Sequence, residues 1–240
     1  MPNWLVRLRG EKFDLEDLPS LLRSPEHTVI EEDGSYYLKS SDFDSFSSAD
    51  DVRKCAIKII DWLNGAMKLR SPNFRSVFED GVTFINEDGK RHHYVYLKGT
   101  IAARTKVSAE LTTSNGTLQV APQPSDVESW LSLAKRDKAV ADAFHFFGFR
   151  RDWFNLYKVY EIIRDDVGGE VKLKEKNWVP NKYLKNFTRT AQSREAIGDD
   201  ARHASEKPAP PEKNPMTRKE AESLIRKLLR DWLSSKTQRH

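Results

Sequence analysis

The sequence contains a single cysteine and no long apolar run. Cys55 is the only cysteine among the 240 residues, so neither an internal disulfide nor a cysteine-based zinc finger can form. No apolar stretch approaches the about 20 residues that a helix needs to cross a bilayer. The first nine residues, MPNWLVRLR, lack the apolar segment of a secretion signal. These absences predict a soluble, cytoplasmic protein without a membrane partner.

Several motifs that mark enzymes are also missing. There is no GxxxxGK[ST] or GxGxxG phosphate loop, no GxSxG elbow and no HExxH pair. His92 and His93 are adjacent on an expected strand, and successive strand side chains point to opposite faces, so the two are poorly placed to share one metal. We therefore expect no cofactor, no metal site, and neither nucleotide hydrolysis nor acyl transfer by these motifs.

Aromatic and charged residues are abundant and unevenly placed. The aromatic content of 10% is too high for a disordered chain. From Glu170 to the C-terminus there are 17 Lys and Arg against 10 Asp and Glu, whereas the preceding residues hold 23 against 26. The basic C-terminal third either faces phosphate groups or is a solvated, lysine-rich surface.

Residues 1–111 have the pattern of a small sheet with one long helix. Residues 4–9 are a candidate first strand. Asp-Gly pairs at 33–34 and 88–89 predict hairpin turns within 28–39 and 82–99, with strand character continuing over 100–111. Between the hairpins, apolar residues recur every three or four positions from a cap at Ser48 to Pro72, with Cys55 expected in the core. An antiparallel sheet with this helix on one face is the simplest packing.

The second part of the chain has helical periodicity. A small, polar, Pro-containing stretch over 112–125 is the expected linker, and 126–240 the helical domain. We expect helices over 126–136, 138–147 (stopped by Gly148), from Asp152 to Gly168-Gly169, and 181–193, with a polar stretch before Pro180. A Pro-rich connector, 207–215, precedes a last helix that is capped by Thr217 and Glu220 and carries five basic residues largely off its apolar stripe. The predicted fold class is α+β: an N-terminal antiparallel sheet with one long helix, followed by a C-terminal α-helical bundle.

The stretch GDDARHA, residues 198–204, is the main candidate for chemistry. His203 can exchange a proton near neutral pH, Arg202 can hold a phosphate with two hydrogen bonds, and Asp199 and Asp200 can orient either. The alternative is a polar helix end, whose charges suit the local dipole. Glu161, on the most aromatic helix, is a further candidate that could pair with Arg202 or Arg189 across the bundle.

Three segments together carry a family resemblance. DWFNLYKVYEII, then FTRTAQSREAIGDDARHA, then PMTRKEAESLIRKLLRDWL after Pro-rich sequence, resemble the HEPN-type helical domains of bacterial proteins over about residues 126–240. The resemblance implies a helical bundle that often dimerises. In its active members an arginine and a histidine cleave RNA without metal, by assisting attack of the 2′-hydroxyl on the adjacent phosphate.

The chain departs from the active pattern around its histidine. Arg202 directly precedes His203, Arg194 is too far upstream, and Asp199 and Asp200 would repel phosphate. Our leading hypothesis is therefore a bacterial accessory or defence-type protein that binds RNA or a protein partner without catalysis. One alternative is a metal-independent ribonuclease using His203 and Arg202, with Arg194 or Arg189 contacting phosphate. Another is a structural or oligomerisation protein, with a homodimer formed through the helical domain.

Overall fold

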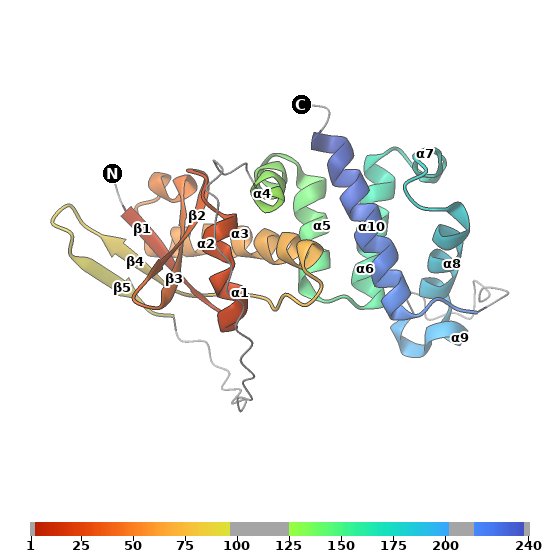
Figure 1. The fold of residues 1–240 in the computed structure, drawn as a ribbon, viewed down its shortest axis with the longest axis horizontal. Helices are drawn as coiled ribbons and strands as arrows, with labels where there is room; N and C mark the ends of the chain where they lie inside the picture. The colour runs from red at the N-terminus through yellow and green to blue at the C-terminus, as the bar shows by residue number, and fades with distance from the viewer. Residues whose placement is uncertain (1–2, 97–124, 202–213, 238–240) are drawn as a thin grey trace, which may run out of the picture.

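A computed structural model of the chain describes residues 3–96, 125–201 and 214–237 (Figure 1). The fold is α+β, as predicted: an N-terminal antiparallel sheet and a helical region that follows it. Within the described ranges the strands are β1 (Asn3–Arg9), β2 (His27–Glu32), β3 (Ser35–Ser40), β4 (Phe78–Ile85) and β5 (Arg91–Tyr94). The helices are α1 (Lys12–Glu16), α2 (Leu18–Leu21), α3 (Ala49–Arg70), α4 (Asp126–Arg136), α5 (Lys138–Phe149), α6 (Trp153–Asp166), α7 (Glu170–Glu175), α8 (Asn181–Gln192), α9 (Arg194–Ile197) and α10 (Arg218–Thr237), with 3₁₀ turns η1 (Ser41–Ser45) and η2 (Gly198–Asp200).

The sheet has the order β2-β3-β1-β4-β5, and every neighbouring pair is antiparallel. Both predicted hairpins are confirmed. Asp33 and Gly34 have φ angles of 50° and 70°, and Gly89 has a φ of 77°, the positive values that these tight turns require. The strand character predicted over 100–111 lies outside the described residues.

A bulge in β4 keeps the side chains of Val82 and Glu79 on the same face of the sheet. Val6 pairs with Val82 and Leu8 with Glu79, so β4 has one more residue than β1 between these pairs, and Gly81 there has a φ of 118°. Glu79 is thereby buried beside α3, where its Oε1 accepts a hydrogen bond from Arg53 Nε at 2.6 Å. This bond raises the pKa of Arg53. The ion pair fixes the first half of α3 to the sheet.

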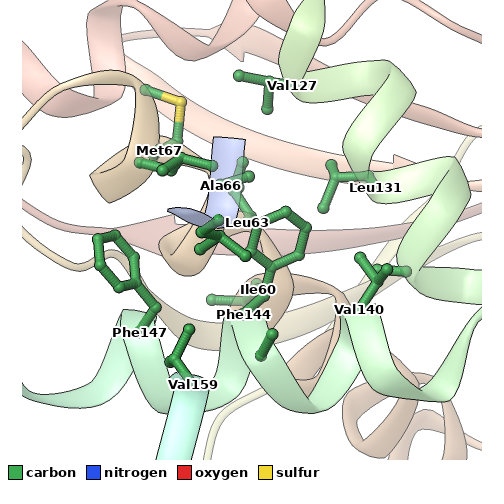
Figure 2. Packing of buried hydrophobic residues seen from close by; sticks show 14 of the residues in the cluster. Ile60, Leu63, Ala66, Met67, Val127, Leu131, Val140, Phe144, Phe147 and Val159 are labelled. Carbon is green, nitrogen blue, oxygen red and sulfur yellow. The ribbon is translucent and has the colours of Figure 1, made fainter. Parts of the chain in front are cut away.

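Helix α3 is the element that the sheet and the other helices share. Its cap is confirmed, since the Ser48 hydroxyl accepts from Asp51 N, and it ends at Arg70, with Ser71 as the C-cap before Pro72. One side packs on β1 and β4, and the other on α4 and α5. Figure 2 shows side chains of α3, among them Leu63 and Met67, against those of α4, α5 and α6. The predicted stripe is buried except for Cys55, which is half-buried at the margin of the same core.

Two glycines let α3 and α5 cross at close range. A Cβ atom on Gly65 would lie 2.4 Å from the carbonyl oxygen of Phe144, and one on Gly148 would lie 2.8 Å from Gly65 N. The prediction that Gly148 stops its helix is wrong, because α5 continues to Phe149, and the missing side chain of Gly148 leaves room for the backbone of Gly65. A glycine can be required either where a helix ends or where another chain segment approaches closely. The two cases look alike in the sequence.

The helical region follows the predicted order with three short additions. The Ser125–Glu128 and Thr217–Glu220 capping boxes and the Asp152 cap form as hydrogen-bonded pairs. The polar stretch before Pro180 contains the short helix α7, and α9 and η2 follow α8; none of these was predicted, and α1, α2 and η1 were missed as well. Each spans six residues or fewer, too short to show a helical repeat of apolar positions. None of the helices that the structure describes is long and apolar enough to cross a membrane.

The glycine crossing gives the first prediction. Alanine at an ordinary helical glycine stabilises a protein by about 1 kcal/mol. At Gly65 the new methyl group would meet the backbone of Phe144, so we expect Gly65→Ala to lower the free energy of unfolding by roughly 1–3 kcal/mol. Urea denaturation measures the change. Lys58→Ala, on the exposed side of the same helix, should stay within about 0.5 kcal/mol of the wild type. A stabilised Gly65→Ala protein would contradict the crossing.

The buried histidine of β2 gives the second prediction. His27 is 2% exposed; its Nδ1 lies 3.1 Å from Ser40 Oγ, and within the described residues its Nε2 has no hydrogen-bond partner. Burial lowers the pKa of His27 below its usual 6.5. The unfolded chain therefore takes up a proton first as the pH falls, and stability is lost from about pH 6.5 down to the folded pKa, by at most about 1.4 kcal/mol per pH unit.

Urea denaturation of the wild type and His27→Gln between about pH 7.5 and 5 measures this effect. The free energy of unfolding of His27→Gln should depend less steeply on pH than that of the wild type. His92→Gln, at an exposed position on β5, should keep the wild-type dependence. Parallel curves for the wild type and His27→Gln would show that His27 does not carry the dependence.

Candidate nucleic-acid interface along the last helix

The structure places part of the GDDARHA stretch. Arg202 and His203 lie outside the described residues, so their role stays a prediction. Asp199 and Asp200 form the turn η2, directly after α9, which begins at Arg194. Arg194 Nη2 lies 2.8 Å from Asp199 Oδ1, and both side chains are exposed. An exposed ion pair of this kind is weak, but it lowers the positive charge that Arg194 can offer a phosphate.

The other two candidates belong to α6 and α8, which pack together through aromatic rings. Glu161 on α6 contacts Lys158 Nζ at 3.3 Å, and Arg189 on α8 is half-buried. The helices meet through four rings, with centroid distances between 5.6 and 6.1 Å: Trp153, Tyr157, Tyr160 and Phe187. Burial raises the pKa of Tyr160 to about 12, so this phenol stays uncharged at neutral pH. The pairing of Glu161 with Arg189 stays a prediction, and its pairing with Arg202 lies outside the described residues.

A different surface has the shape of a binding site. Three hollows of about 660, 790 and 710 Å³ follow one another along α10. The first two share Lys219 and Ser223, and the last two share Pro72 and Arg230, so they form one groove, which we call the α10 groove. A helix of this length spans roughly 30 Å. Of the predicted site residues that the structure describes, none lines it.

Two arginines that line the α10 groove, Arg226 and Arg230, bind the carboxyl end of α3. Arg226 donates to the carbonyl oxygens of Lys68 and of Leu69, the latter at 2.8 Å, and Arg230 donates to Leu69 O at 2.9 Å. The last carbonyls of a helix have no partner within it, and cationic donors also suit its negative end. These bonds join α10 to α3 across more than 150 residues of sequence.

Charge around these arginines is partly neutralised. Glu222 lies 2.9 Å from Arg226 and 2.6 Å from Arg151, which also donates to Pro72 O at 2.8 Å. Burial lowers the pKa of Arg226, and Glu222 opposes that shift. An arginine nevertheless keeps its charge at any ordinary pH. Arg151 and Arg226 are thus committed to the structure of the groove.

Lys68 adds a buried cation behind the same groove. It is 8% exposed, and its Nζ donates to the carbonyl oxygen of Gly148, at the end of α5. Burial, and then the nearby Arg151, lower the pKa of this lysine. The carboxyl ends of α3 and α5 therefore meet beside α10, and cationic side chains satisfy both.

Other cations on the α10 groove remain available to a ligand. Arg70, Lys219 and Lys227 are exposed; only Lys227 has an ion pair among the described residues, with Asp231 at 2.7 Å. Aromatic rings stand at the two ends: Trp130 is half-buried, and Tyr183 is 46% exposed with Lys182 Nζ 5.0 Å from its ring centroid. Basic side chains along a channel with aromatic rings are what single-stranded nucleic acids bind.

Part of this surface could be predicted from the sequence. The basic residues of the last helix lie off its apolar stripe, which indicates a positively charged face. The contributions of Arg70, Pro72 and Arg151 were missed, because they come from segments that only the fold brings beside α10.

Metal binding finds no support in the described residues, which contain no group of three or more His, Cys, Asp or Glu side chains able to hold an ion. Comparisons of the chain with models of protein families, with curated proteins and with solved structures found no match.

The arginine contacts give a third prediction. Arg226→Met keeps much of the side-chain volume but removes the side-chain donor to Lys68 O, one of two donors to Leu69 O, and one of the two arginine partners of Glu222. A buried carbonyl left without its donor costs about 1–3 kcal/mol, so we expect a loss of roughly 1–3 kcal/mol in the free energy of unfolding. Lys227→Met, one position further along α10, removes an exposed ion pair and should cost less than about 1 kcal/mol. Equal effects in urea denaturation would contradict the anchoring role of Arg226.

Proposed function

We propose that this chain is a non-catalytic RNA-binding module that holds single-stranded RNA in the α10 groove. The observation that carries the proposal is the continuity of this groove, whose cations come from α3, the segment before α6, and α10. The excess of Lys and Arg after Glu170 agrees with a polyanionic partner. The resemblance of residues 126–240 to HEPN-type domains supports RNA as that partner.

The arrangement of charges favours binding over cleavage. The exposed cations Arg70, Lys219 and Lys227 are spread along the groove, which suits contacts to successive phosphates. Catalysis would instead need donors and a proton carrier converging on one phosphate. Asp199, which holds Arg194 in the predicted cluster, also disfavours a phosphate there.

Fluorescence anisotropy measures the binding of a labelled single-stranded RNA of mixed sequence over a salt series. This experiment tests the proposal and gives a fourth prediction. The variant Arg70→Gln/Lys219→Gln/Lys227→Gln should bind at least about 10-fold more weakly near 0.1 M salt, because it removes three phosphate contacts. The slope of log K against log salt should become shallower by about 2, since each contact to a single strand contributes roughly 0.7.

A variant with the same loss of charge elsewhere is the control. Lys12→Gln/Lys54→Gln/Lys58→Gln changes exposed lysines that do not line the groove, and its affinity should stay within about 2-fold of the wild type. Equal weakening by both triple variants would mean that RNA responds only to net charge. RNA cleavage in EDTA that is lost in His203→Ala would instead favour the ribonuclease alternative.

A further inference from the structure

A second pocket, far from α10 in the fold, is walled by aromatic rings. It has a volume of about 410 Å³, and its lining includes Trp4, Phe46, Phe84, Tyr94 and Asp44. The centroid of the Trp4 ring lies 4.8 Å from that of Phe84 and 6.2 Å from that of Tyr94. We call this site the aromatic pocket. Its volume falls within the range of small-molecule sites.

The sheet register explains why these rings gather. Trp4 on β1 is opposite Phe84 on β4, and Tyr94 on β5 is opposite Val82, two positions from Phe84. Three neighbouring strands therefore present aromatic side chains on one face. The turn η1 supplies Asp44, and Phe46 follows it; the indole Nε1 of Trp4 donates to Phe46 O at 3.1 Å. That bond fixes the indole in the wall, while Tyr94, 43% exposed, stands at the rim.

The charge of the aromatic pocket is negative. The faces of aromatic rings carry partial negative charge, and Asp44 adds a carboxylate. Three exposed rings elsewhere already have a cation of the protein above them: Arg9 over Phe78, Lys158 over Phe154 and Lys182 over Tyr183. No lysine or arginine of the described residues lines the aromatic pocket or pairs with Asp44. Its walls therefore favour a positively charged ligand.

The composition of the pocket wall favours one class of cation. The side-chain acceptors on its lining are the Asp44 carboxylate and the hydroxyls of Ser45, Ser47 and Tyr94, whereas the indole nitrogen of Trp4 only donates. Four of the seven lining residues are aromatic, so ring surface makes up more of the wall than acceptors do. A quaternary ammonium needs no hydrogen-bond acceptor and binds to ring faces. We propose that the aromatic pocket binds a trimethylammonium group, which either a small molecule or a methylated lysine side chain can supply. This proposal does not depend on RNA binding.

NMR titration of the nitrogen-15-labelled full chain tests the proposal, with the Trp4 indole N–H as reporter. The probes are choline, an Nε-trimethyllysine amide, the unmethylated lysine amide, and 3,3-dimethylbutanol, a neutral molecule of the same shape as choline. We expect saturable shifts with at least one trimethylammonium probe, and at least about 10-fold weaker binding of the neutral molecule and of unmethylated lysine. The stronger of the two trimethylammonium probes identifies the source of the group.

Variants connect the binding to the aromatic pocket. Tyr94→Ala and Asp44→Asn change exposed residues and should each weaken binding by about 5-fold or more, whereas Phe78→Ala, an exposed ring outside the pocket, should leave it unchanged. The proposal is overturned if no trimethylammonium probe saturates, if 3,3-dimethylbutanol or unmethylated lysine binds as tightly, or if Tyr94→Ala binds like the wild type.

Discussion

The close crossing of α3 and α5 at Gly65 and Gly148 is the contact on which the rest of the structure depends. Because neither residue has a Cβ atom, the two helices approach until backbone meets backbone, and the carboxyl ends of both lie together. Since α3 is also the helix that covers the sheet, this one crossing joins the β-rich and helical parts of the chain through a single core. It also gathers the unpaired carbonyl groups of two helix ends in one place, and these must find donors.

The positive charge beside α10 follows in part from that need. Arg226 and Arg230 bind carbonyls of α3, and Lys68 binds the carbonyl of Gly148, so these cations belong to the architecture before any ligand is considered. The number of basic residues near α10 is therefore larger than the number of cationic side chains that a polyanion could contact. Exposure separates the two groups: the Arg226 side chain is 13% exposed and that of Lys227 is 59% exposed. The proposed RNA site rests on the exposed group, while the buried group joins α10, α3 and α5.

Most of the regular fold could be predicted from local pattern. Hairpins at Asp33-Gly34 and Asp88-Gly89, the Ser48 cap of α3 and the Thr217–Glu220 box of α10 each depend on residues a few positions apart, which a sequence displays directly. The errors have a common cause. Gly148 and the partners of Arg226 acquire their roles from segments more than 80 residues away, and short elements such as α7 have no repeat to detect. The candidate site was predicted as a cluster in sequence, whereas both proposed binding surfaces are assembled from distant segments.

The two proposed sites stand at opposite ends of α3. The segment that leads into its first turn walls the aromatic pocket, and its last residue, Arg70, lines the α10 groove. A packed helix of this length, fixed at one end by the Arg53–Glu79 pair and at the other by Arg226, holds the sites at a constant separation. Coupling of affinities between sites would require an element with two alternative arrangements, and a helix anchored at both ends is poorly suited to supply one. A ligand that reaches both sites would therefore gain from effective concentration, with the linker between its two groups setting the size of the gain.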